Sequence, residues 1–179
     1  MSPNIIFNFV LFQATWFGSV VGAGVYQLHW LAISAAVLVF AHAMTTPSRW
    51  TDLTNAGIAV FVGYTLDNVW VTLGFLSYPE SHLAPYWLAI LWFGFGLSIN
   101  HSLKFFRDLK WLGAVIVGAF GPVTYLSAEQ FGAVTVNHPF QLLWVTITWI
   151  FLFRGLTFYS MWHLGQNHFG YDQPESTID

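Results

Sequence analysis

Long apolar runs separated by short polar breaks make up almost the whole chain. A helix needs about 20 apolar residues to cross a bilayer. Six runs approach that length, at about 4–24, 28–46, 54–77, 83–104, 110–133 and 139–163. Each run is continuously apolar, without the alternation of a barrel strand. The pattern predicts an all-α bundle of about six transmembrane helices in one domain over 1–165, followed by a polar tail over 166–179.

The composition supports a membrane location and excludes several kinds of function. Only 7% of the residues are charged and 56% are hydrophobic, whereas a soluble domain carries about 25% charged residues. Because this number of charged residues is too small to cover a water-exposed surface, lipid is expected to face much of the chain. Because there is no cysteine, disulfides, thiolate metal sites and cysteine nucleophiles are excluded. The thin net charge of −3, without a basic cluster, argues against nucleic-acid binding.

The few cations indicate the direction of the spans. Arg49 lies in the second expected loop, and Lys104, Arg107 and Lys110 bracket the fourth, while the odd-numbered loops contain no Lys or Arg. Cytoplasmic loops carry the excess of positive charge. The even-numbered loops, and with them both termini and the polar tail, are therefore expected in the cytoplasm.

The ten tryptophans divide into two groups. Those at expected helix ends suit the headgroup region: Trp30, Trp50, Trp87, Trp111 and Trp162. Those inside the runs are not explained by an interfacial belt: Trp16, Trp70, Trp92, Trp144 and Trp149. The second group is interpreted either as bulky packing or as the lining of an aromatic pocket. Packing is the simpler interpretation, because aromatic side chains also dominate ordinary cores.

Polar residues inside the apolar runs are the candidate ligand-binding residues, because such groups are costly in a bilayer and normally face the bundle interior. Placed by depth, they form a polar column in the cytoplasmic half and the centre, drawn from all six helices. The candidates are Asn8, Gln13, His42, Asp67, Asn100, His101, Tyr125, Glu129 and Arg154. His42 and His101 have matched depths and are expected to approach each other.

Asp67 is the first of these candidates, because long apolar stretches flank it on both sides. A buried carboxylate must be paired or take up a proton. Asp67 is therefore either a proton-carrying or ligand-anchoring group, or one half of a structural ion pair with Arg154, whose depth differs by about one turn. In a third alternative, the side chain of Arg154 extends toward the cytoplasmic surface, which would leave Asp67 without that partner.

No familiar catalytic or metal-binding pattern is present. The sequence has no Ser-His-Asp motif, phosphate loop or close carboxylate pair, and the seven histidines lack the spacing of a metal-binding helix. We predict no metal site and assign neither catalytic residues nor a cofactor. Pro122 predicts a kink in the fifth run, and Tyr125 and Glu129 follow it on one helical stripe. Both either border a substrate site or, as the favoured alternative, hydrogen-bond neighbouring helices.

The polar and glycine positions together carry a family resemblance. The residues are Asn8, Phe12-Gln13, Trp16, His42, Leu66-Asp67, Gly74, Pro85, Trp87, Leu91-Trp92, Asn100-His101-Ser102-Leu103, Gly118, Gly121-Pro122, Tyr125 and Gly132-Ala133-Val134. From about Asn8 to about Trp149, the chain resembles the bacterial inner-membrane family called domain of unknown function 2878. Ser127-Ala128 departs from its pattern, which affects the packing expected beside Tyr125. The resemblance implies a multi-pass bacterial inner-membrane protein without an established activity, and genes beside family members hint at lipid chemistry.

Three functions remain open at this point. The first is a binder or carrier of a lipid-like or small apolar molecule within the bundle, which suits interior tryptophans and a few polar anchors. The second is a membrane-embedded lipid-modifying enzyme that uses His101, His42 and Asp67. The third is an accessory subunit of a larger membrane complex. The expected partners are accordingly membrane lipids, an apolar ligand or another membrane protein, and the sequence favours the first function slightly.

Overall fold

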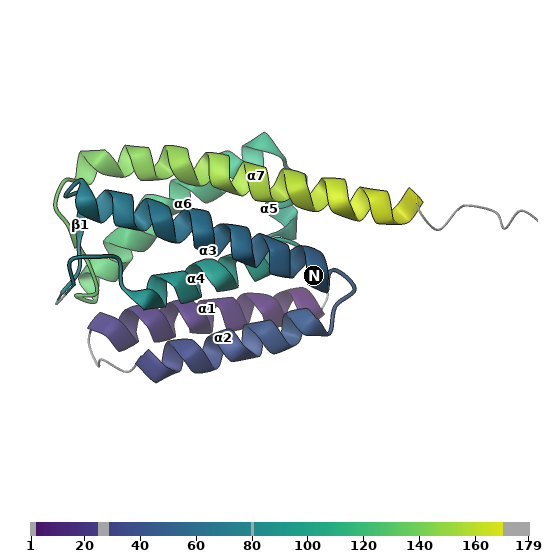
Figure 1. Cartoon of the computed structure of the whole chain (residues 1–179), viewed down its shortest axis with the longest axis horizontal. Helices are drawn as coiled ribbons and strands as arrows, with labels where there is room; N and C mark the ends of the chain where they lie inside the picture. The colour runs from purple at the N-terminus through teal and green to yellow at the C-terminus, as the bar shows by residue number, and fades with distance from the viewer. Residues whose placement is uncertain (1–2, 25–28, 80, 170–179) are drawn as a thin grey trace, which may run out of the picture.

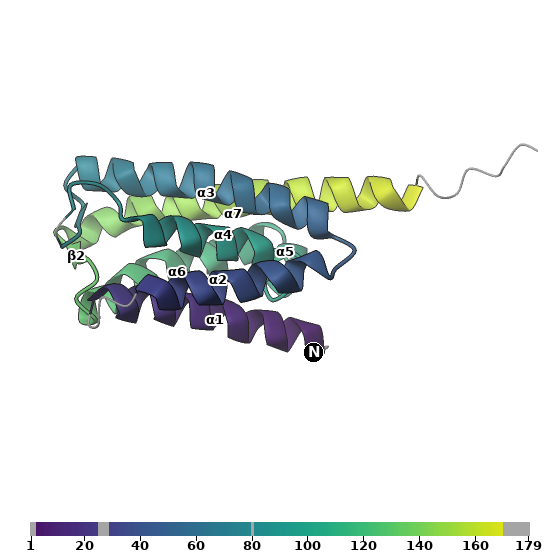
Figure 2. The same cartoon turned by 60° about the horizontal axis from the view of Figure 1, so that its bottom comes forward.

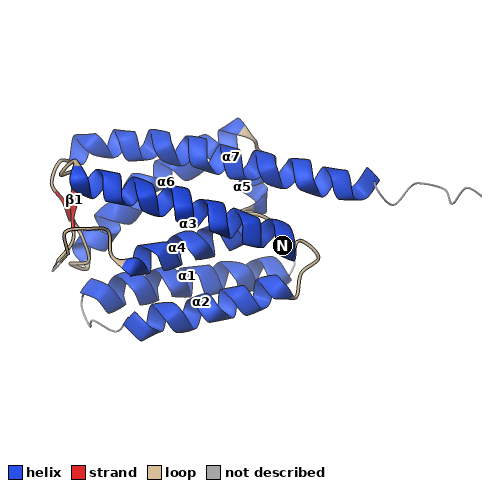
Figure 3. Cartoon of the chain, in the orientation of Figure 1, coloured by secondary structure: helices blue, strands red, loops and turns tan. Residues whose placement is uncertain are grey.

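The computed structural model describes residues 3–24, 29–79 and 81–169, and the fold over these ranges is almost entirely helical (Figure 3). The helices are α1 (Pro3–Gly24), α2 (His29–Met44), α3 (Arg49–Thr72), α4 (Tyr86–Ser98), α5 (Lys104–Asp108), α6 (Trp111–Gln130) and α7 (Leu142–Phe169). A single turn of 3-10 helix, η1 (Pro139–Gln141), precedes α7. Two short strands, β1 (Leu76–Ser77) and β2 (Thr135–Val136), pair antiparallel. The predicted all-α helical bundle is therefore confirmed.

The long helices run along one common axis and pack in neighbouring pairs (Figures 1 and 2). The closest pairs are α1 with α2, α3 with α4, and α6 with α7, while α4 also packs on both α1 and α2. The β1–β2 pair lies at one end of the bundle, here called the hairpin end (Figure 1, left). The start of α1, the α2–α3 loop and α5 lie at the opposite end, here called the N-terminal end.

Within the residues that the structure describes, three helices are long and apolar enough to cross a membrane, namely Ile5–Gly24, Trp111–Gln130 and Pro139–Gly165. Large apolar side chains also point outward, among them Phe61, Phe105 and Phe140, which are 76%, 68% and 96% exposed. A surface of this kind suits lipid and not water. These features fit a membrane protein, while the total of six spans and the cytoplasmic position of both ends stay predictions.

The fourth expected span, 83–104, is wrong as one continuous helix. The helix α4 ends at Ser98, residues 99–103 form turns, and the short α5 follows. Asn and Ser side chains compete with the helical backbone for hydrogen bonds, and Asn100 and His101 here bond to a carboxylate on α3 instead. The break therefore comes from tertiary contacts of the side chains that follow α4.

The third span is also shifted relative to its expected range of 54–77. The helix α3 begins at Arg49 and ends at Thr72. At its end, Gly74 adopts a φ of +74°, and Phe75 N donates to Trp70 O at 2.8 Å. This geometry is a helix C-terminal motif for which glycine is suited, because it has no Cβ to clash in the left-handed region. The chain then turns into β1 at the hairpin end.

The last helix continues beyond the expected start of the polar tail. The helix α7 reaches Phe169 and extends past the N-terminal end of the bundle (Figure 1), whereas the tail was expected from residue 166. The remainder of that tail, residues 170–179, lies outside the described residues. The division into a domain over 1–165 and a tail over 166–179 stays a prediction.

The packing of α3 on α4 depends on small residues at the contact. A Cβ added at Gly63 would overlap the indole ring of Trp92, and one added at Gly96 would overlap the backbone around Ala56. Small residues let helix backbones approach closely in membrane bundles. Gly63 therefore makes room for the ring of Trp92, which is 4% exposed.

The substitution Gly63→Ala is expected to destabilise the protein by about 1–3 kcal/mol, because the added methyl group overpacks this contact. Gly57, on the same helix, has no neighbour within 4 Å of an added Cβ. Gly57→Ala is therefore the matched control, and it should stabilise the helix by about 0.5–1 kcal/mol. Thermal unfolding in lipid nanodiscs, followed by circular dichroism, measures both. Equal shifts for the two variants would contradict this account of the packing.

Candidate functional site

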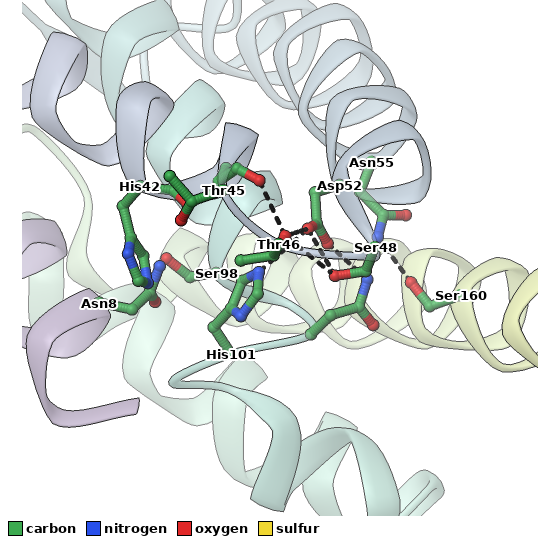
Figure 4. Close-up of polar contacts among 12 residues, drawn as sticks. Asn8, His42, Thr45, Thr46, Ser48, Asp52, Asn55, Ser98, His101 and Ser160 are labelled. Carbon is green, nitrogen blue, oxygen red and sulfur yellow. Dashed lines mark hydrogen bonds and ion pairs between the residues drawn. The ribbon is translucent and has the colours of Figure 1, made fainter. Parts of the chain in front are cut away.

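The carboxylate of Asp52, in the first turn of α3, is the centre of a buried polar network at the N-terminal end (Figure 4). Asp52 is 0% exposed. Ser48 Oγ donates to its Oδ2 at 2.8 Å, and Thr46 Oγ1 donates to the same atom at 3.2 Å. From the turn after α4, Asn100 Nδ2 donates to Oδ1 at 2.7 Å, and His101 Nε2 lies 3.0 Å from Oδ2. Both carboxylate oxygens are thus satisfied without water.

A second layer of contacts surrounds this network. Arg107 Nη1 donates to Asn100 Oδ1 at 2.7 Å, and the same guanidinium binds Asp108 Oδ1 through Nε and Nη2 at 2.9 and 2.8 Å. Asn8, on α1, accepts a hydrogen bond from the backbone N of Ser102 at 3.3 Å. The network therefore joins α1, α3, α5 and the 99–103 turn. Its arrangement indicates a structural role, in which Asp52 holds these elements together.

His42 and His101 do approach each other, with ring centroids 5.8 Å apart. His42 also meets the ring of Phe7 edge-on, at 5.2 Å between centroids. Four of the nine candidate residues, Asn8, His42, Asn100 and His101, thus gather at the N-terminal end. Their role in ligand binding stays a prediction.

Asp67 forms a second, separate cluster further along α3. Its side chain is buried, with Trp92 Nε1 donating to Oδ2 at 2.7 Å and the hydroxyl of Tyr125 donating to Oδ1. At the rise of an α-helix, Asp67 lies about 22 Å along α3 from Asp52. The expected single polar column is therefore divided into two clusters with apolar packing between them.

Arg154 does not pair with Asp67 in the part of the chain that the structure describes. Its guanidinium lies 5.5 Å from the ring of Trp111 and 5.7 Å from that of Phe158. Trp111 is the first residue of α6, so this contact lies toward the N-terminal end. Two of its nitrogens, Nε and Nη1, are buried without a hydrogen-bond partner among the described residues, so cation–π contacts take the place of the ion pair. The alternative in which Arg154 reaches toward the cytoplasmic surface stays a prediction.

The remaining two candidates have different surroundings. Glu129 Oε1 accepts a hydrogen bond from Val136 N at 2.8 Å. It therefore connects the end of α6 to the strand β2, whereas the favoured alternative expected a bond to a neighbouring helix. Gln13, on α1, borders an internal cavity. Of the two residues predicted to share the stripe with Pro122, only Tyr125 faces this cavity.

A cavity of about 500 Å³ lies between α1, α4 and α6. Most of its lining is apolar, and among the described residues none of the lining side chains is charged. Its aromatic wall includes Trp16, Trp87, Trp92 and Trp149. Trp16, Trp92 and Trp149 belong to the group of interior tryptophans, for which a pocket was the less favoured interpretation. Trp87, expected in an interfacial belt, is instead 3% exposed.

The mouth of the cavity lies between α1 and α6, on the side of the bundle. Four lining side chains there are about half exposed, Phe9 and Phe17 on α1 and Phe120 and Val123 on α6. The helix α1 packs mainly on α2 and α4 and makes few contacts with α6, which leaves this side open. Along α6 the lining extends from Val117 to Ala128, a length of about 16 Å.

Tyr78, between β1 and α4, borders the cavity at the hairpin end and was not among the predicted site residues. Its side chain is 6% exposed, and its hydroxyl has no hydrogen-bond partner among the described residues. Burial, together with the nearby Asp67, raises the pKa of the Tyr78 phenol well above its ordinary value. The hydroxyl is therefore protonated at neutral pH and able to donate.

Sequence reasoning missed Asp52 as well as Tyr78. The apolar run was counted from residue 54, but Ser48 followed by an acid in the first turn is a helix start signal that would have placed Asp52 inside α3. Tyr78 carried no comparable signal, because it lies in a connecting segment. Its burial arises only when the hairpin end folds over the bundle.

The fold and the cavity together define the class, a helical protein with apolar outer faces and an aromatic internal cavity. The family model described as "Protein of unknown function (DUF2878)" matches residues 5–154, and the chain belongs to this family. The match confirms the resemblance recognised in the polar and glycine positions. No curated protein and no solved structure matches the chain.

The substitution Asp52→Ala is expected to destabilise the protein by about 3–5 kcal/mol, because it leaves the buried donors of Ser48, Asn100 and His101 without their acceptor. Asp108→Ala is the control. Its carboxylate binds Arg107 directly, but its side chain is 52% exposed, so the cost should stay below about 1 kcal/mol. Thermal unfolding in nanodiscs distinguishes the two variants. Similar losses of stability in both would argue against a structural role of the network centred on Asp52.

Proposed function

We propose that this protein binds one lipid-like, largely apolar molecule in the cavity between α1, α4 and α6. The observation that carries the proposal is the aromatic-lined cavity of about 500 Å³ with its mouth on the side of the bundle. Ligand sites typically enclose about 300–1,000 Å³, with apolar walls and a few polar groups. The cavity lies within that range and has that composition.

The shape and lining of the cavity support a chain-like ligand. A polar or charged molecule would lose its hydrogen bonds to water here without compensating partners. An alkyl or isoprenoid chain makes no such hydrogen bonds and therefore loses none of them. The lining extends for about 16 Å along α6, so such a chain would lie parallel to the helices. The half-exposed Phe9 and Val123 at the mouth would face the bilayer interior, from which the ligand enters.

The bundle is proposed to sit in a bacterial inner membrane with both termini in the cytoplasm. Lys104, Arg107 and Lys110 belong to or adjoin α5, at the same end as the start of α1 (Figure 1). Positive residues favour the cytoplasmic side. This distribution supports an orientation in which the Asp52 network is near the cytoplasm and the hairpin end is on the opposite side.

Binding is favoured over lipid modification because the proposed catalytic groups do not converge. An enzyme using His42, His101 and Asp67 together needs these side chains around one reacting atom. The histidines lie at the Asp52 network, and Asp67 is about 22 Å further along the bundle. Asp67 is also fully engaged by Trp92 and Tyr125, which suits a positioning role behind the cavity wall.

The substitution Val123→Trp is expected to reduce co-purified ligand at least tenfold, because the indole would fill the mouth of the cavity. Val115→Trp is the matched control. Both valines are on α6 and about half exposed, at 51% and 50%, but Val115 does not line the cavity. Native mass spectrometry of protein released from nanodiscs, with lipid extraction, measures the occupancy. A wild-type protein without any bound molecule, or equal occupancy in both variants, would overturn the proposal.

A further inference from the structure

We infer that the molecule bound in the cavity is a lipid with an uncharged headgroup whose oxygen accepts a hydrogen bond from Tyr78. This inference rests on the proposed function and adds the chemical class of the ligand. It also gives the ligand a direction, with the headgroup at the hairpin end and the chain running toward the N-terminal end.

The unused hydroxyl of Tyr78 is the first observation. Its ring packs edge-on against Trp87, with centroids 5.8 Å apart, and both residues line the cavity. Another largely enclosed tyrosine of the chain, Tyr64, donates to Ala84 O at 2.7 Å, as buried hydroxyls normally do. A buried hydroxyl without a partner is unfavourable, and a ligand oxygen at this position supplies the missing acceptor.

Two other residues of the cavity lining, Trp92 and Tyr125, are already engaged, so they form a fixed part of the wall. Trp92 Nε1 and the hydroxyl of Tyr125 both donate to Asp67, and neither has a hydrogen left for a ligand. The oxygen of Tyr125 retains an acceptor position. An alcohol, ester or ketone oxygen suits this combination, because it can accept a hydrogen bond from Tyr78. An alcohol can in addition donate its hydroxyl hydrogen to the oxygen of Tyr125.

A second unpartnered hydroxyl, that of Ser102, lines the cavity at the N-terminal end. Its neighbours in the lining are apolar, among them Phe9, Leu103 and Phe106. At that end the backbone N of Ser102 is already bound to Asn8 Oδ1 at 3.3 Å, whereas two tyrosines, Tyr78 and Tyr125, line the cavity at the hairpin end. The hairpin end is therefore the better position for a headgroup.

The lining also selects against charge. No Lys, Arg or His is among the described lining residues, so an anionic headgroup would be desolvated without a counter-ion. A cationic headgroup gains little, because both oxygens of Asp67 already accept hydrogen bonds and the carboxylate does not line the cavity.

Three probes with the same saturated chain test the headgroup class, namely methyl laurate, laurate and dodecyltrimethylammonium. Each is titrated into the protein in nanodiscs at mildly alkaline pH, where laurate is ionised, and concentrations are referred to the mole fraction in the disc. Tryptophan fluorescence reports binding, because four tryptophans line the cavity. Methyl laurate is expected to bind at least tenfold more tightly than either charged probe. Equal or tighter binding of a charged probe overturns the inference.

The substitution Tyr78→Phe then tests the hydrogen bond. It is expected to weaken methyl laurate binding roughly tenfold and to raise the unfolding temperature of the empty protein, because an unsatisfied buried hydroxyl is removed. Tyr159→Phe, on α7 away from the cavity, should change neither. A loss seen instead with Ser102→Ala, or unchanged affinity in Tyr78→Phe, refutes the role of Tyr78.

Failure of this inference is distinguishable from failure of the proposed function. If the probes bind and Val123→Trp blocks them, but Tyr78→Phe has no effect, the cavity binds lipids without this headgroup contact. If no probe binds and no molecule co-purifies, the proposed function itself fails.

Discussion

A carboxylate removed from water must be surrounded by donors, and α3 carries two such carboxylates on one continuous helix. Asp52 collects donors from the α2–α3 loop and from the turn after α4. Asp67 collects donors from α4 and α6. Because each group is costly unless satisfied, these bonds fix how α4 and α6 are placed against α3. The rest of the bundle is arranged around that placement.

The cavity follows from the same bonds. Asp67 holds Trp92 and Tyr125, which are part of its wall, and Gly63 leaves room for the indole ring. At the other end, the bonds to Asp52 stabilise the 99–103 turn, which contributes Ser102 and Leu103 to the lining. Neither carboxylate borders the cavity directly. Both act through the side chains that they position, so the apolar space has a fixed shape.

This arrangement separates stability from recognition. The polar groups of the two clusters are largely satisfied by one another, whereas the hydroxyl of Tyr78 faces the cavity without a partner among the described residues. Functional positions commonly retain such unsatisfied groups, because a ligand completes their hydrogen bonds. The proposed lipid would thus be recognised by its chain through the aromatic wall and by its headgroup through one phenol.

The sequence by itself determined the helical class and the membrane character, because hydropathy and run length are local properties of the chain. It also identified some of the buried polar residues, namely Asn8, Asp67, Asn100 and Tyr125, since a polar group inside an apolar run is visible without a structure. Only the tertiary structure decided which of them meet. The break after α4, the importance of Asp52, the separation of Asp67 from Arg154 and the exposure of Tyr78 to the cavity depend on distances between different helices. Packing sets those distances, and the order of residues along a single helix does not reveal them.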